Sequence, residues 1–214
     1  MGEINRQLDA KNIILTERRI NIIDATPIGA AQSGSGKGKD GQPKRGRQAG
    51  CHVKKDSRGN LKSTYGYTVH MGVDEDGFIQ RQAVTAGNVH DSVERDTLLL
   101  GDETALYADA AYSSKETCDR LERFGIADQA QRKGYHNKPR SAKDRRRNDA
   151  IAVIRAGGER PFATYKSRYG SARKRFMGLA KNMTAYGIAA IAHNLRKGAN
   201  FLTLYGLPDP NYTR

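Results

Sequence analysis

An apolar run that contains a single acid, NIIDATPIG at residues 21–29, restricts the possible folds of this chain more than any other feature. Its isoleucines are typical of a buried strand, and Pro27 and Gly29 indicate that the strand stops there. Burying the carboxylate of Asp24 costs on the order of several kcal/mol unless a cation or hydrogen bonds compensate it. The run therefore predicts a strand with Asp24 at its tip, facing a polar site.

Further short apolar runs, separated by turn residues, extend the pattern of strands. In YGYTVHMGV every second residue packs well in a sheet, and the turn DEDG leads into another run, which predicts a β-hairpin. TALYADAAY repeats the features of the first run and places a second aspartate, Asp109, in a short buried strand. The predicted strands are residues 65–73 and 78–85 around the turn 74–77, then 104–112 and 126–131.

Two short helices are predicted from the spacing of their first residues. Asp91 with Glu94, and Ser113 with Glu116, have the spacing of capping boxes. The dipeptide His90-Asp91 is open to a functional interpretation, but a helix cap explains Asp91 well. The two predicted helices cover residues 91–100 and 113–125.

The C-terminal part of the chain is predicted to be helical. A polar helix is expected over residues 142–156 and a largely apolar one over residues 182–197, with Gly198 ending the second. His193 in this second helix is expected to be a structural residue of the core and not a ligand.

The order of these elements predicts an α/β fold with a mixed β-sheet flanked by helices. A chain of 214 residues fits one domain, expected over residues 1–214 with a C-terminal helical part at 142–200. Residues 30–60 are rich in Gly, Lys, Ser and Gln and contain no aromatic residue, so they predict a flexible basic insertion after the first strand. A solvated linker without a function is the alternative for that segment.

Basic residues are concentrated in three segments. The chain has 37 Lys and Arg against 23 Asp and Glu, and residues 37–62, 132–147 and 166–181 hold the excess of positive charge. Such segregated charge is typical of a protein that binds a polyanion, and nucleic acid is the common one because each neutralised phosphate releases counterions. Charge alone specifies neither a DNA sequence nor a reaction.

Nothing in the sequence indicates a membrane or an oxidising compartment. No apolar stretch reaches the roughly 18–20 residues of a membrane span, and the first residues lack the pattern of a signal peptide. Cys51 and Cys118 lie far apart and indicate neither a zinc motif nor a disulfide framework. A cytoplasmic protein without a membrane partner is expected.

Asp24 and Asp109, in similar strand settings, predict a metal site. Hard oxygen ligands suit Mg²⁺ or Mn²⁺, which take one or two carboxylates together with water and substrate phosphate oxygens. Two such ions can clamp an in-line displacement at phosphorus, and that mechanism needs a third carboxylate. Glu159, the one glutamate after Glu122, is the candidate. The structural alternatives are a turn residue at Asp24 and a surface ion pair at Glu159.

Four motifs occur in order along the chain: IIDATPIG around Asp24, GNVHDS at residues 87–92, LYADAAY around Asp109, and IRAGGERPFATYKSRYGSARKRFMGLAKN at residues 154–182. Together they resemble the DDE transposases of bacterial insertion sequences, in particular the insertion-sequence-five type. The resemblance covers about residues 12–200. It implies a ribonuclease H-like core in which Asp24, Asp109 and Glu159 are catalytic and bind two Mg²⁺ or Mn²⁺ ions.

The last motif also resembles the Y-x2-R-x3-E-x6-K signature of related transposases, with Arg155, Glu159 and Lys166 in the corresponding positions. Ala152 stands where that signature has its tyrosine. Offsets of 4 and 7 residues place side chains on one face of a helix, so two cations would flank the carboxylate and bind phosphates. The residues expected to bind DNA are Arg155, Lys166, Arg168, Arg173, Lys174 and Arg175.

Two glycines and a proline complicate this helix. Gly157 and Gly158 weaken a helix, and Pro161 removes a hydrogen bond, so a kink or a restart near Arg160 is expected. In a restarted helix Arg155 would not share a face with the glutamate, which favours Lys166 as the residue that binds phosphate.

The resemblance implies an enzyme, a metal-dependent DDE transposase that acts as polynucleotidyl transferase and endonuclease. It would cut double-stranded DNA at transposon ends and join the 3′ hydroxyl to target DNA. Joining two ends implies a homodimer on DNA, and the expected location is the bacterial cytoplasm, at the nucleoid. The family's N-terminal recognition region is expected to be missing. Two alternatives stay open: a non-catalytic nucleic-acid-binding remnant or domesticated fragment, and a nuclease of the same fold without strand transfer.

Overall fold

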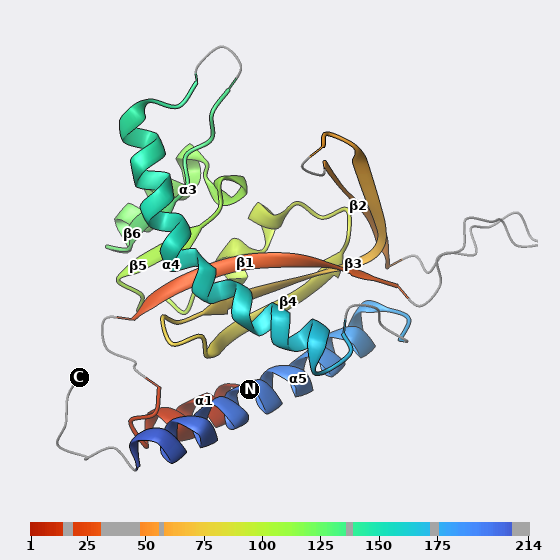
Figure 1. Cartoon of the computed structure of the whole chain (residues 1–214), viewed down its shortest axis with the longest axis vertical. Helices are drawn as coiled ribbons and strands as arrows, with labels where there is room; N and C mark the ends of the chain where they lie inside the picture. Colours follow the sequence, from red (N-terminus) through yellow and green to blue (C-terminus); the bar gives the residue numbers. More distant parts are fainter. Residues whose placement is uncertain (15–18, 31–47, 56–57, 136–138, 172–175, 207–214) are drawn as a thin grey trace, which may run out of the picture.

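The computed structural model of the chain describes residues 1–14, 19–30, 48–55, 58–135, 139–171 and 176–206 (Figure 1). These residues form a mixed β-sheet flanked by helices, as the sequence predicts. Different helices pack on the two faces of the sheet, and a hydrophobic core lies on each face.

The strands of the sheet are β1 (Ile20–Gly29), β2 (Gly50–Lys55), β3 (Leu61–Val73), β4 (Ile79–Ala86), β5 (Ala105–Ala108) and β6 (Ala127–Ala130). Within the described residues their order is β2-β3-β1-β5-β6, and β4 also pairs with β3. β3 is antiparallel to β1, β2 and β4, whereas β5 is parallel to both β1 and β6. The predicted hairpin is confirmed as β3 and β4, and the predicted last strand as β6.

The helices are α1 (Gly2–Asp9), α2 (Arg95–Leu98), α3 (Lys115–Arg123), α4 (Ala142–Ser167) and α5 (Leu179–Tyr205), with short 3₁₀ turns η1 (Asp91–Val93) and η2 (Ala110–Tyr112). Helix α4 crosses one face of the sheet, and α5 lies beside it and contacts α1 (Figure 1). Among the described helices, none combines the length and the apolar character that a bilayer crossing needs.

Each face of the sheet has its own set of buried side chains. On the α4 and α5 side, Phe162, Tyr165 and Tyr186 pack against strand residues that include Ile22. On the other side, Tyr112 and Leu121 belong to a second cluster. Because side chains alternate along β1, neighbouring isoleucines serve opposite cores.

The first strand is longer than the sequence predicts, and Asp24 lies within it and not at its tip. β1 pairs with β3 from Ile22 to Gly29, straight through Pro27. Within the described residues β5 pairs only with Ile20 to Ile22, so the rest of β1 lacks that neighbour. A proline is tolerated in a strand where one edge is unpaired, which explains why Pro27 does not end β1.

Part of the predicted insertion at residues 30–60 is a strand. Residues Gly50–Lys55 form β2 and pair with β3, which begins at Leu61, four residues before the predicted start. Pairing with β3 gives the main chain of this polar segment hydrogen-bond partners without requiring a hydrophobic core. Residues 31–47 and 56–57, which hold most of the predicted insertion, lie outside the described residues.

Both short helices are capped by residues other than the predicted ones. His90, and not Asp91, caps η1: its Nδ1 accepts a hydrogen bond from the Ser92 main-chain N–H. Ser114, and not Ser113, caps α3 and accepts from the Thr117 N–H at 3.1 Å. The helix predicted over 91–100 is only η1 followed by α2. Asp91 therefore does not have the capping role that its spacing to Glu94 predicts.

Helix α4 runs without interruption from Ala142 to Ser167, so the predicted restart near Arg160 is wrong. Gly158 lies against β1, and a Cβ there would be 2.8 Å from Ile22 Cγ2. The glycine therefore permits close packing of the helix on the strand and does not end the helix. With the helix continuous, the preference for Lys166 over Arg155 also loses its reason.

Helix α5 likewise continues past its predicted end, to Tyr205. Gly198 lies inside it, where a Cβ would be 3.1 Å from the Leu8 side chain of α1. His193 is buried, and its Nε2 lies 3.1 Å from the Gly77 carbonyl oxygen. The prediction that His193 is a structural residue is confirmed.

Candidate active site

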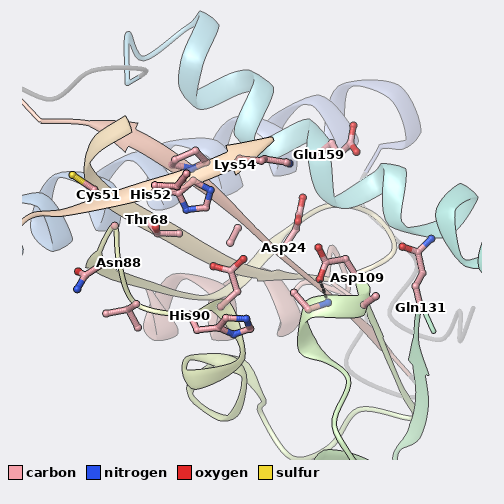
Figure 2. Close-up of a pocket in the computed structure, with 18 of the residues that line it drawn as sticks. Asp24, Cys51, His52, Lys54, Thr68, Asn88, His90, Asp109, Gln131 and Glu159 are labelled. Carbon is pink, nitrogen blue, oxygen red and sulfur yellow. Dashed lines mark hydrogen bonds between the residues drawn. The ribbon is translucent and has the colours of Figure 1, made fainter. Parts of the chain in front are cut away.

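A cleft of about 810 Å³ opens between β1, β2, the segment after β4, the segment after β5, and helix α4 (Figure 2). Its wall contains all three predicted acids, Asp24, Asp109 and Glu159, and also Arg155. These residues are separated by up to 135 positions in the chain, and the fold brings them to one place.

The pairing of β1 with β5 explains why the two aspartates meet. The last pair in the parallel register joins Ile22 to Tyr107. Asp24 and Asp109 each stand two residues beyond that pair, so both reach the same end of the β1–β5 contact. In Figure 2 their carboxylates lie near the centre of the pocket.

Asp24 is a partly buried carboxylate with an excess of negative charge around it. Its side chain shares a strand face with Thr26, toward α4. Burial raises the pKa of Asp24 above its usual range, and the charges of Asp109 and Glu159 raise it further. The Ala25 main-chain N–H and the Arg155 guanidinium act in the opposite direction. A cation placed among these acids would relieve the repulsion.

Asp109 follows the last residue of β5 and caps η2. One oxygen, Oδ1, accepts a hydrogen bond of 2.8 Å from the Ala111 N–H. This bond holds the side chain at the C-terminal end of β5, where it lines the pocket. The strand predicted over residues 104–112 is shorter in the structure: β5 ends at Ala108, so Asp109 follows the strand and does not lie within it.

Arg155 connects helix α4 to the aspartate site. Its Nη2 lies 3.5 Å from Asp24 Oδ1, and its Nη1 donates a 3.0 Å hydrogen bond to Gln131 Oε1. The Gln131 main-chain N–H in turn donates to the carbonyl of Ala108, next to Asp109. The guanidinium thus connects Asp24 of β1 with Gln131, the residue that follows β6.

Glu159 lies one helical turn beyond Arg155 and lines the same pocket, but its side chain is exposed. Figure 2 shows its carboxylate on α4, turned away from Asp24 and Asp109. Within the described residues, no three His, Cys, Asp or Glu side chains lie close enough together to hold one metal ion. The structure therefore brings Glu159 to the site without placing it against the aspartates.

The donor set nevertheless suits a hard divalent cation. Asp24 and Asp109 supply carboxylate oxygens, and Mg²⁺ commonly takes one or two carboxylates and completes its shell with water and substrate phosphates. Tyr112, three residues after Asp109, has a buried hydroxyl without a hydrogen-bond partner within the described residues. The pKa of this phenol is raised first by burial and then by the charges of Asp91, Asp24 and Asp109. Its hydroxyl therefore lies within the field of the acids that line the cleft.

The remaining basic candidates differ in how well the structure places them. Lys166 extends to β1, where its Nζ donates a 2.7 Å hydrogen bond to Thr26 Oγ1. Arg168 is exposed at the C-terminal end of α4. Arg173, Lys174 and Arg175 lie outside the described residues.

The pocket also contains residues that sequence reasoning did not assign to it. Asp91 lines the pocket from the segment after β4, and His52 and Lys54 line it from β2. The motif GNVHDS contained the signal for Asp91, but capping-box spacing led to a different interpretation. His52 and Lys54 are two positions apart, which places both side chains on one face of a strand. This spacing was not recognised because the segment was predicted to be flexible.

Comparisons with known proteins show which family the chain resembles. Residues 15–195 match the family model described as "Transposase DDE domain". The chain is also 29% identical, over 207 residues, to a protein of Neisseria meningitidis serogroup B described as transposase for insertion sequence element IS1106. That alignment covers 94% of this chain and 72% of the relative.

Proposed function

Because the chain belongs to the family of transposase DDE domains, we propose that it cuts DNA at transposon ends and joins the exposed 3′ hydroxyl to target DNA. The observation that carries the proposal is the meeting of Asp24 and Asp109 at one end of the β1–β5 contact, with Glu159 in the wall of the same pocket. Similarity to the insertion-sequence-five type, read from the four sequence motifs, belongs to the same proposal.

We further propose that the core is ribonuclease H-like. The support is the arrangement of the strands when β2 is set aside. An antiparallel set of β1, β3 and β4 is followed by β5 and β6, and β5 is parallel to β1 and β6. In this arrangement the three acids come from one strand, from the end of its parallel neighbour, and from a helix on the sheet.

Asp24 and Asp109 would hold the divalent cations, and Glu159 would join them by a change of its exposed side chain. When bound, Mg²⁺ or Mn²⁺ activates the attacking hydroxyl or water and stabilises the leaving oxygen. Arg155 now compensates part of the Asp24 charge, and in the complex its guanidinium can turn to a substrate phosphate.

DNA is the proposed partner. Arg155 and Lys166 both contact β1 from helix α4, one on each side of Glu159, so a phosphate backbone that lies along α4 meets a cation before and after the glutamate. Phosphate contacts of this kind position DNA and do not read its sequence. A homodimer on DNA and a place in the bacterial cytoplasm at the nucleoid are parts of the same proposal.

Metal-dependent nicking tests the proposal. The substrate is a labelled duplex that contains the DNA flanking this gene, incubated with Mg²⁺ or Mn²⁺. We expect nicking by the wild-type chain and a loss of about 100-fold or more in Asp109→Asn, as is usual when a group that acts in the transition state is removed. Asp119→Asn is the matched control, because Asp119 is exposed on α3 and does not line the cleft.

The alternatives give different results in the same assay. DNA binding without nicking under either metal would support a non-catalytic remnant. Nicking without transfer of a labelled 3′ end to a plasmid would support a nuclease. Nicking that is equally fast in Asp109→Asn would contradict the proposed site.

A further inference from the structure

Asp91 is a carboxylate of the pocket that the three-acid arrangement leaves without a role. It stands five residues after the end of β4, lines the pocket and is partly buried. Within the described residues no hydrogen bond to its carboxylate is found, and the capping of η1 is done by His90. A partly buried carboxylate without a structural hydrogen bond needs another explanation.

A buried histidine stands behind this carboxylate. His70, on β3, is 0% exposed, and its Nε2 lies 2.9 Å from Thr85 Oγ1. The other ring nitrogen, Nδ1, has no hydrogen-bond partner within the described residues and lies 3.8 Å from Asp91 Oδ1. Burial lowers the pKa of His70 to about 4, so the ring is neutral near pH 7 and the two residues do not form an ion pair there.

This geometry is that of a polar group placed to orient a carboxylate. If the Thr85 hydroxyl donates to Nε2, the proton of the neutral ring is on Nδ1 and points to Asp91. At 3.8 Å the contact is too long for a hydrogen bond, and a small movement of Asp91 would close it. Ligating carboxylates usually accept a hydrogen bond from a neighbouring group, and His70 would supply that bond to Asp91 once the gap closes.

Asp91 lies near the two aspartates. It lines the same pocket as Asp24 and Asp109. The buried, unpartnered hydroxyl of Tyr112 has its pKa raised by burial and then by the charges of Asp91, Asp24 and Asp109. The turns η1 and η2, which contain Asp91 and follow Asp109, contact each other.

We propose that Asp91 is a fourth carboxylate of the divalent-cation site, and that His70 is the residue that positions it. Asp91 would contact the cation held by Asp109. The site would then draw on three carboxylates besides Glu159, namely Asp24, Asp91 and Asp109. In this structure they do not lie close enough together to hold one ion, so binding would bring Asp91 toward Asp109. This inference rests on the proposed function, because it adds a ligand to the same metal site.

Metal affinity, measured by titration calorimetry with Mn²⁺ and no DNA, tests the role of Asp91 without depending on activity. We expect Asp91→Asn to bind Mn²⁺ at least about 10-fold more weakly than the wild type, and the matched control Asp119→Asn to bind as the wild type does. Wild-type affinity in a folded Asp91→Asn protein would overturn the inference.

Asp109→Asn in the same titration separates the two proposals. If Asp109→Asn loses affinity and Asp91→Asn does not, the further inference fails and the proposed metal site stands. If neither variant loses affinity, the proposed site itself fails, and the inference fails with it.

Two substitutions of His70 test its positioning role. His70→Asn keeps a donor near the place of Nδ1, whereas His70→Leu fills the space without one. We expect Mn²⁺ affinity to fall in His70→Leu and to be largely retained in His70→Asn. Equal affinities in the two variants, both folded by circular dichroism, would overturn the positioning role.

A measurement on the wild-type chain covers the case in which a variant does not fold. Fe²⁺ in place of Mg²⁺, with ascorbate and peroxide, produces radicals that cut the main chain near the bound ion, and mass spectrometry locates the cuts. We expect cuts at residues 90–92 together with cuts near Asp24 and Asp109. Cuts at the two aspartates without any at 90–92 would overturn the inference.

Discussion

The guanidinium of Arg155 lies 3.5 Å from the carboxylate of Asp24, although 131 positions separate the two residues in the chain. One belongs to a helix that packs across the sheet and the other to the sheet's first strand. Their distance is set by how closely α4 approaches β1, and that approach depends on Gly158.

Gly158→Ala tests this dependence. A Cβ at Gly158 would meet Ile22 Cγ2 at 2.8 Å, so the helix has to move away from the strand. We expect a loss of about 1–3 kcal/mol in the free energy of unfolding, as is typical of overpacking. Urea denaturation measures the change.

Gly157→Ala is the control for that substitution. Its Cβ would lie 3.6 Å from Ile22 Cδ1, an ordinary contact, and alanine favours a helix over glycine by up to about 1 kcal/mol. We expect this variant to be as stable as the wild type or more stable. Equal effects of the two alanines would contradict the role given to Gly158.

Removing Arg155 is expected to raise the pKa of Asp24 further. The guanidinium lowers the pKa of this carboxyl, whereas burial, Asp109 and Glu159 raise it. In Arg155→Met the protonated form of Asp24 is therefore more populated at a given pH. Titration of ¹³C-labelled aspartate carboxyls by NMR, without metal, measures the shift. Arg160→Met is the control, since Arg160 is exposed on the same helix. An unchanged Asp24 titration in Arg155→Met would mean that the 3.5 Å contact is absent in solution.

Lys166→Met is expected to weaken DNA binding and to reduce its salt dependence. If Lys166 leaves Thr26 for a phosphate, its loss removes one charge contact, so the slope of log K against log [salt] should become shallower by about 0.9. Fluorescence anisotropy at several salt concentrations gives the slope. Lys115→Met, at an exposed lysine of α3, should leave the slope unchanged. An identical slope in the two variants would remove Lys166 from the DNA interface.

The buried Asp74 is expected to make the protein less stable as the pH rises. Its carboxylate accepts hydrogen bonds from Phe78 N–H and Gln80 Nε2, both at 2.8 Å, yet burial raises its pKa to about 7. In the unfolded chain the pKa is near 4, so between about pH 4 and 7 the folded state binds more protons than the unfolded state. Stability from this group is complete below pH 4 and is lost as the pH rises to 7, at up to about 1.4 kcal/mol per pH unit.

Urea denaturation at several pH values checks this sign. Asp74→Asn replaces the carboxyl with a group that does not titrate. From pH 4 to 7 the unfolding free energy of the wild type should therefore fall relative to that of the variant. A difference that is constant over this range would show that Asp74 keeps an ordinary pKa in the folded protein.

The strands other than β2, and the two aspartates, were predictable because their signals are local. Alternating apolar residues in β3 and the isoleucines beside Asp24 express a preference for a half-buried strand, whatever the rest of the chain does. Asp109 was found because it is the one acid in the short apolar run at residues 104–112, although that run did not show that β5 ends at Ala108. The order of the motifs then indicated that these acids belong together.

The glycines misled the sequence analysis because their role depends on another element. Glycine often ends a helix, but Gly158 and Gly198 each lie where a helix packs closely on a neighbouring element. Gly158 packs against Ile22, and Gly198 packs against Leu8. Propensity disfavours glycine in a helix by about 1 kcal/mol, and tertiary packing overrides this. No local pattern in the sequence distinguishes the two uses.

Asp91 was misassigned for a similar reason. Its spacing to Glu94 fits a capping box, and nothing in the sequence shows that His90 takes the cap instead. Its neighbour His70 is a buried residue of β3, and β4 lies between the two in the chain. The residues around Asp91 therefore do not reveal this contact.

The uninterrupted course of α4 has a consequence for how such a chain can change its length. Arg155, Glu159 and Lys166 are aligned by the helix alone, so additions to the connection between β6 and α4 leave their mutual alignment intact. One residue inserted between Arg155 and Glu159 would instead rotate everything that follows by about 100°. Relatives that tolerate insertions before this helix should therefore be common, and those with insertions inside it should have lost transposition.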